Sequence, residues 1–333
     1  MWSDFTNINN EKFINNKYIL PNDNLIKYMK DERTKILSFN KDYNITIKKI
    51  KDFNHIIKDL GNTSWVESKK LMADLVNLPI NILIKWNDNS ITIKCKEEHI
   101  KTFIKRVNTL INMIEYLKIK SDNINKSVNI FLVLSTLEKT FPENNIMGVA
   151  NANTGYTDSS NNIIFVWRYE EFEKVIFHEI IHYFNMDCKY QNITKRINID
   201  GPHDYIEAIT DYFGIIYNII YLSILTKNKI KNLMELELTF IRNQAYMLNH
   251  IYDLGVWNNK PNKVIKQKTG AFSYYIIKYL LFAYVINNNI IDYNKKTELD
   301  FNKLLDLILI NGMPKYNNII EIKSSRMTLL QLK

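Results

Sequence analysis

The sequence predicts an α+β fold, with a mixed sheet in its first half and a mostly helical second half. Segments with strand-like alternation lie before residue 170, whereas apolar residues after Asp187 recur at helical spacing. Glycine (8) and proline (6) are scarce among 333 residues, which disfavours disorder and turn-rich all-β folds. With 46% hydrophobic residues, the chain can bury the cores of about two domains.

Residues 1–96 are expected to form a small N-terminal α/β region. Alternation over residues 44–48 predicts a strand, and residues 80–86 and 90–96 have the pattern of a hairpin joined at Asn87-Asp88-Asn89. A helix should begin at Glu97, because two acidic residues open it and apolar residues then keep helical spacing.

Residues 97–186 are expected to hold the main sheet and the helix that carries the chemistry. Strand patterns cover residues 128–134, 146–156 and 162–168, and a turn at residues 158–161 joins the last two. The helix from about residue 170 to 185 follows directly, opening with two glutamates and burying an apolar face.

Residues 187–333 are expected to form a helical subdomain. The apolar spacing predicts the following helices: residues 204–225, 233–254, 269–286 and 301–309. The apolar stretches 213–226 and 274–286 fall short of the roughly 20 residues that a membrane span needs. We therefore expect no membrane span.

Charge and cysteine content favour an intracellular protein that does not bind nucleic acid. The net charge is +9, but the lysines are spread along the chain and are expected to form solvated faces. Cys95 and Cys188 lie far apart, so a reducing compartment is the simpler assumption, and the N-terminus lacks a secretory pattern. The richness in Asn, Ile and Lys is typical of an AT-rich genome, such as that of a large DNA virus, a clostridium or some protists.

The motif His178-Glu179-Ile180-Ile181-His182 lies in the helix predicted for residues 170–185. Histidines four apart on a helix stack on one face, so both imidazoles can reach one tetrahedral Zn²⁺ at about 2.0–2.1 Å. Glu179 is placed to take a proton from the zinc-bound water and pass it to the departing amine. A single helical histidine is usually a core or surface residue, but this pair lies in an amphipathic helix directly after a strand.

Two histidines leave a catalytic zinc one protein ligand short. Glu207, near the start of the next predicted helix, is the leading candidate, and Asp211 follows on the same face. Asp211 would then accept a hydrogen bond from the outer nitrogen of His178. The rival ligands are His203 and Asp204, and a solvated acidic pair on a surface helix is the alternative without a metal.

The combination of His178-Glu179-x-x-His182 with Glu207-x-x-x-Asp211 resembles the gluzincins, the thermolysin-like zinc metallopeptidases, over residues 97–285. The resemblance implies a zincin-like fold, one zinc per chain held by His178, His182 and Glu207, and a peptide or protein substrate. Asn151-Ala152 looks like the Asn-Ala pair on the substrate-binding edge strand of that family. The composition suits a viral member, which would be cytoplasmic or associated with the virion.

Two other functions remain open from the sequence. One is a toxin-like protease that cleaves a specific host protein, because clostridial neurotoxin light chains share the histidine motif and the Asn-Ile-Lys-rich composition. The other is an inactive zincin fold retained as a structural or binding protein, against which the intact Glu179 argues.

The group that stabilises the oxyanion should come from the helical half. Tyr274 and Tyr275 open a predicted helix after a polar loop, so one of them could face the cleft while the other packs inward. His250 is the rival donor.

Overall fold

The structure is a computed structural model that describes residues 3, 6, 21–49, 68–187, 198–201, 204–255, 263–288, 312–313, 320 and 322–332. The chain divides into two compact units, each assembled from separate segments of the sequence. The sheet unit comprises Arg33–Glu138 and Asn153–Met186. The helical unit comprises Met1–Glu32, Lys139–Ala152 and Asp187–Lys333.

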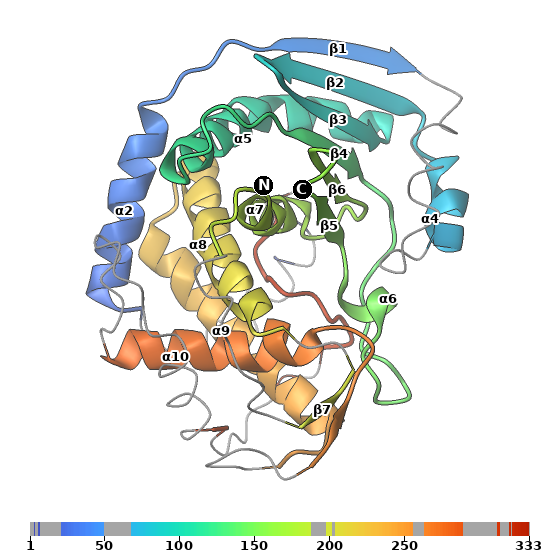
Figure 1. The fold of residues 1–333 in the computed structure, drawn as a ribbon, viewed down its shortest axis with the longest axis vertical. Helices are drawn as coiled ribbons and strands as arrows, with labels where there is room; N and C mark the ends of the chain where they lie inside the picture. The colour runs from blue at the N-terminus through green and yellow to red at the C-terminus, as the bar shows by residue number, and fades with distance from the viewer. Residues whose placement is uncertain are drawn as a thin grey trace. The chain divides into compact units, whose positions relative to one another are not determined.

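The sheet unit contains a six-stranded mixed sheet with the strand order β1-β2-β3-β4-β6-β5 (Figure 1). Its strands are β1 (Asn44–Lys49), β2 (Ile80–Trp86), β3 (Asn89–Cys95), β4 (Asn129–Val133), β5 (Gly155–Asp158) and β6 (Ile163–Val166). Strands β3, β4 and β6 run parallel, and the other neighbouring pairs are antiparallel. The α+β class and the strands expected near residues 44, 80, 90, 128 and 162 are thereby confirmed.

The predicted hairpin joins β2 to β3. Ile80 lies opposite Cys95 and Trp86 opposite Asn89, so the turn is at Asn87-Asp88. Asn87 has a φ of 45°, and asparagine tolerates this left-handed conformation better than most residues. The turn residues therefore set the register of the hairpin.

One face of the sheet packs against α4 (Ser68–Leu75). The buried cluster on this face consists of Leu71, Leu75, Leu78, Val133, Phe165 and Trp167, with Tyr156 of β5 packed against it. Successive side chains of a strand point to opposite faces of a sheet. Gly155 and Thr157, the neighbours of Tyr156, therefore lie on the other face.

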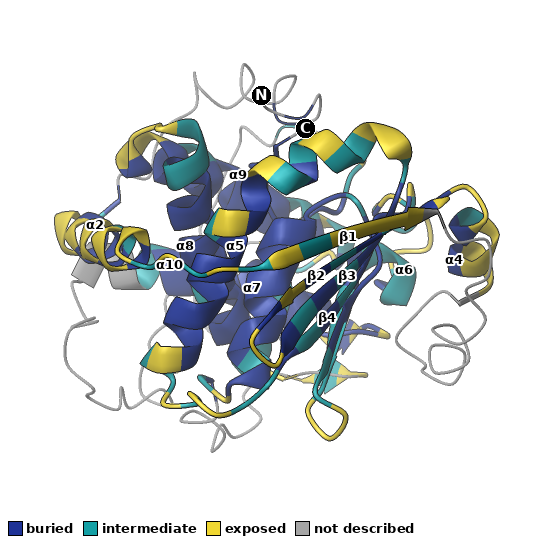
Figure 2. Cartoon of the chain, turned by 90° about the horizontal axis from the view of Figure 1, so that it is seen from above, coloured by how far each residue is buried: buried dark blue, intermediate teal, exposed yellow. Residues whose placement is uncertain are grey.

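The other face of the sheet is covered by α5 (Ile100–Lys120) and α7 (Phe172–Tyr183). The indole Nε1 of Trp86 in β2 donates to Glu115 of α5 at 2.9 Å, and α7 packs against β5 and β6. The two helices are joined by an ion pair, 2.6 Å long, between Arg106 and Glu173. Every residue of α7 except His182 is buried, and most of the helix is dark blue in Figure 2.

The helical unit contains α8 (Ile206–Thr226), α9 (Ile230–Ile251) and α10 (Lys278–Asn288). A π-helical turn over Ser273–Ile277 leads into α10. These elements confirm the three helices predicted near residues 204, 233 and 269, and the helix predicted for residues 301–309 lies outside the described residues. Two short strands, β7 (Ile199–Asp200) and β8 (Ile265–Lys266), pair in parallel.

The apolar stretch 213–226 is only part of α8, so the whole helix is longer than the stretch on which the expectation of no membrane span is based. Among the described residues, α8 is long and apolar enough to cross a membrane by length and composition. However, 83% of its most apolar window is buried within the protein, as in the core helix of a globular protein. Helix α8 is therefore weak evidence for a membrane span.

The C-terminal segment 322–332 lies mostly buried within the helical unit. The Gln244 amide of α9 donates to the carbonyls of Ser324 and Arg326 at 3.0 and 2.9 Å. The Glu237 carboxylate, also on α9, accepts the backbone N–H groups of Leu329 and Leu330 at 3.1 and 3.3 Å. Side chains of α9 thus satisfy the backbone of a segment without regular secondary structure.

The strand predicted for residues 146–156 is wrong over its first part. Val149–Ala152 form a single helical turn, α6, and strand β5 begins at Gly155. The Asn151 side chain stabilises this turn, because its Oδ1 accepts the Gly148 N–H at 2.9 Å and its Nδ2 donates to Thr140 O at 2.7 Å. Asn151 and Ala152 therefore do not lie on an edge strand.

Candidate metal centre

His178 and His182 lie one turn apart on α7, with their ring nitrogens close together. The two Nε2 atoms are 3.2 Å apart, and the ring centroids are 4.8 Å apart with planes at 77°. Two imidazole nitrogens on a tetrahedral zinc, each at about 2.0–2.1 Å, would be separated by about 3.3 Å. The pair therefore has the spacing that a shared zinc ion requires.

The two histidines of α7 differ in burial. His178 is buried, with 6% exposure, whereas His182 is partly exposed. The helix is fixed to the sheet and to α5 by buried apolar side chains and by the Arg106–Glu173 ion pair. Ligands on a rigid buried helix need little reordering to bind a metal.

Glu179 lies between the two histidines in the sequence and is 5% exposed. Its Oε2 accepts a hydrogen bond from the Thr157 hydroxyl at 2.8 Å, and its backbone oxygen lies 3.0 Å from the same hydroxyl. Sequence reasoning missed Thr157. The only available signal was the alternation of β5, which becomes informative once the strand's register is known.

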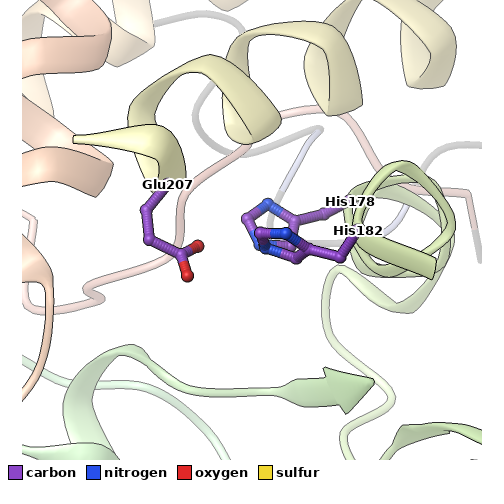
Figure 3. A group of neighbouring side chains, drawn as sticks. All are labelled: His178, His182 and Glu207. Carbon is purple, nitrogen blue, oxygen red and sulfur yellow. The ribbon is translucent and has the colours of Figure 1, made fainter. Parts of the chain in front are cut away.

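Glu207 occupies the first turn of α8. His178, His182 and Glu207 form a group that could hold a metal ion, with one ligand atom from each residue and these atoms within 4.8 Å of one another (Figure 3). Two imidazole nitrogens and a carboxylate oxygen are a common protein ligand set of catalytic zinc.

Asp204 and His203 are the rival candidates for the third ligand. Asp204 is exposed, and its Oδ1 accepts the backbone N–H of Ile206 at 2.9 Å, so it stabilises the start of α8. His203 lies outside the described residues.

Asp211 lies one turn after Glu207 on α8 and is completely buried. Its Oδ2 accepts a hydrogen bond from Lys278 Nζ at 2.6 Å. Sequence reasoning did not identify this cation, and the orienting role of Asp211 towards His178 remains a prediction.

The three candidate oxyanion donors have different surroundings. Tyr275 is 1% exposed, and its hydroxyl donates to the backbone carbonyl of Ser325. Tyr274 is partly exposed, and His250 lies exposed in the last turn of α9. The proton of the Tyr275 hydroxyl is thus already used in a hydrogen bond within the helical unit.

Comparison with known proteins finds a viral relative. The chain is 24% identical over 195 residues to an uncharacterized protein of Acanthamoeba polyphaga mimivirus, which covers 54% of this chain. The chain spans about half the length, 51%, of that curated relative. This similarity points to a viral origin. No protein-family model matches the chain, and no solved structure matches it.

Proposed function

We propose that the chain is a zinc-dependent metallopeptidase that hydrolyses peptide bonds. One observation carries the proposal: the Nε2 atoms of His178 and His182 lie 3.2 Å apart on a buried helix, with the anchored carboxylate of Glu179 on the same helix. Glu207 is the proposed third ligand. These residues provide both a metal site and a base, which are the two requirements for metal-assisted hydrolysis.

The ligand set favours zinc over other divalent ions. Imidazole nitrogens suit zinc well, whereas magnesium and calcium prefer sites made of oxygen ligands. When bound, zinc supplies a Lewis acid that polarises a carbonyl oxygen and makes water more acidic. Three protein ligands would leave one further position on the metal for substrate or water.

Glu179 is proposed as the general acid and base. Its carboxylate removes a proton from the attacking water as the new C–O bond forms, and then delivers that proton to the amide nitrogen as the C–N bond breaks. This role needs a carboxylate that does not bind the metal itself. The hydrogen bond from Thr157 to Oε2 supports such a separate role.

The position of β5 at the edge of the sheet favours a peptide as the substrate. Strand β5 is the last strand in the sheet order and pairs with β6 along one side. An extended peptide can add to such an edge through backbone hydrogen bonds. Because β5 also packs against α7, a peptide on this edge would run beside the helix that carries Glu179.

The proposal is tested by digesting a peptide library with the purified protein. We expect cleaved peptides, loss of cleavage with a zinc chelator, and recovery on adding zinc. Glu179→Gln should retain zinc but lower turnover by roughly 10²–10⁴-fold. The matched control is Glu115→Gln, which changes another buried glutamate and should keep activity. If no peptide is cleaved, or if cleavage survives in Glu179→Gln, the proposal is wrong.

A further inference from the structure

We propose that two residues of strand β5 position the catalytic base Glu179 of α7. Thr157 restrains the Glu179 carboxylate by a hydrogen bond, and Gly155 leaves the space that the Glu179 side chain occupies. This inference rests on the proposed function, because it assigns a task to residues around the same base. Neither residue belongs to the histidine motif or to the candidate ligands.

The register of β5 brings both residues to α7. Gly155 pairs with Val166 and Thr157 with Ile164, whereas Tyr156 packs on the opposite face against the α4 cluster. Residues two apart in a strand share a face, so Gly155 and Thr157 both point towards the helix. The structure agrees, because the Thr157 hydroxyl donates to Glu179 and a Cβ atom added at residue 155 would meet the Glu179 side chain.

Thr157 contacts both the side chain and the backbone of Glu179. Its hydroxyl lies 2.8 Å from Oε2 and 3.0 Å from the carbonyl oxygen of the same residue. A hydroxyl group has one proton to donate, so the two oxygens share it. The contact therefore restrains the carboxylate relative to the helix that carries both histidines.

Gly155 is required for steric reasons. A Cβ atom at this position would lie 2.8 Å from Oε1 and 3.0 Å from Cγ of Glu179, and 2.7 Å from Cγ1 of Val175. Such distances are shorter than van der Waals contact, so either the glutamate or the strand would have to move. The absence of a side chain at residue 155 lets the Glu179 carboxylate lie directly against β5.

A restrained carboxylate is useful to a general base. A glutamate side chain has several rotatable bonds, and fixing it before the reaction removes an entropic cost from each turnover. A misplacement of about 1 Å can lower a rate by about a hundredfold. Loss of the restraint should therefore affect turnover more than substrate binding.

The first test compares Thr157→Val with Thr157→Ser. Valine keeps the shape but removes the hydroxyl, so kcat should fall roughly 10–100-fold with KM, zinc content and melting temperature close to wild type. Serine keeps the hydroxyl and should restore most of the rate. The matched control is Thr92→Val, a partly buried position on β3 of the same sheet, which should leave kcat unchanged. Equal kcat in wild type and Thr157→Val would overturn the proposal, as would loss of zinc in Thr157→Val or failure of serine to restore the rate.

The second test asks whether the effect passes through Glu179. In a Glu179→Gln background, Thr157→Val should cause little further loss, because the two residues act as one unit. Full additivity of the two losses would contradict a positioning role. Gly155→Ala should lower kcat and retain zinc, and retention of full activity by this variant would show that the space is not needed.

A measurement that does not depend on peptide cleavage distinguishes this inference from the proposed function. Crystal structures of wild type and Thr157→Val should show Oε2 of Glu179 bonded to residue 157 in the first and displaced in the second. An unmoved carboxylate in Thr157→Val would overturn the positioning role even in an active enzyme. If wild type cleaves no peptide but the carboxylate moves as expected, the proposed function fails and the structural restraint stands.

Discussion

The ammonium group of Lys278 lies 2.6 Å from the carboxylate of Asp211, and the two side chains are 2% and 0% exposed. The same Nζ also donates to the backbone oxygen of Met327 at 3.2 Å. Helix α8 thus carries the candidate ligand Glu207 and, one turn later, an acid whose charge is balanced by α10. A buried carboxylate without such a cation would be costly.

Lys278→Met should therefore destabilise the protein strongly. Removing one partner of a buried ion pair leaves the other charge uncompensated and typically costs about 3–5 kcal/mol. Urea denaturation of wild type and variant measures the free energy of unfolding. The control is Lys263→Met, which breaks an ion pair of the same 2.6 Å length to Asp253 at side-chain exposures of 53% and 86%. Solvent screens this exposed pair, so its loss should change the free energy of unfolding far less than the loss of the buried pair. Equal losses in the two variants would show that burial does not govern the effect.

Zinc binding should depend on both histidines of α7. We expect about one zinc per purified chain, and loss of that zinc in His178→Ala and in His182→Ala. His99→Ala should keep its zinc, because His99 is not part of the motif and its ring stacks on Tyr169. Metal content is measured by mass spectrometry after exhaustive dialysis. Full zinc retention in both motif variants would show that these histidines do not bind the zinc.

The third ligand is tested by comparing Glu207 with its rivals. Glu207→Ala should abolish tight zinc binding, whereas Asp204→Ala should affect only the start of α8. If His203→Ala is the damaging change, the third ligand is His203. Zinc affinity is measured by competition with a chelating dye.

Asp211 requires a more careful variant, because its removal would leave Lys278 buried without its acid. The double variant Asp211→Asn with Lys278→Met removes both charges together. If Asp211 orients His178, this variant should bind zinc about 10–100-fold more weakly, as is typical for loss of a group that supports a ligand. A folded double variant with wild-type zinc affinity would show that Asp211 serves the ion pair alone.

The oxyanion donor should be Tyr274 rather than Tyr275. The Tyr275 hydroxyl already donates to Ser325, so Tyr275→Phe should cost about 1 kcal/mol of stability and leave kcat unchanged. Tyr274→Phe should lower kcat with little change in KM, because a donor used only in the transition state acts in this way. Steady-state kinetics on one cleaved peptide distinguishes the variants. If His250→Ala alone lowers kcat, the donor is His250.

Folding stability should fall as the pH rises from about 4.5 to about 7 because of Glu237. Burial raises the pKa of this carboxyl from 4.5 to about 7, against the opposing effects of Thr328 and Lys278. Between these values the folded protein keeps a proton that the unfolded chain has lost, so rising pH favours unfolding by at most about 1.4 kcal/mol per pH unit. Glu237→Gln should flatten this part of the stability profile in urea titrations. An unchanged profile would assign the pH dependence to other groups.

Most of the secondary structure follows from local patterns. The hairpin of β2 and β3, the buried helix α7 and the three helices of the helical unit were all predicted, because apolar periodicity reflects the geometry of a strand or a helix. The spacing of His178 and His182 is local in the same sense. Four residues are about one helical turn, so the two side chains share one face of the helix wherever the helix packs.

The partners of these residues could not be predicted, because they are separated in sequence and are brought together by packing. Thr157 precedes Glu179 by 22 residues, and their contact depends on the register of β5 and on the position of α7 against it. Lys278 follows Asp211 by 67 residues and reaches it through the packing of helices. Asn151 resembled an edge-strand residue, but its side-chain hydrogen bonds stabilise a helical turn. The candidate ligand pair of α7 is therefore encoded within one turn of helix, whereas the residues that contact this turn are brought there by long-range packing, which residue spacing does not encode.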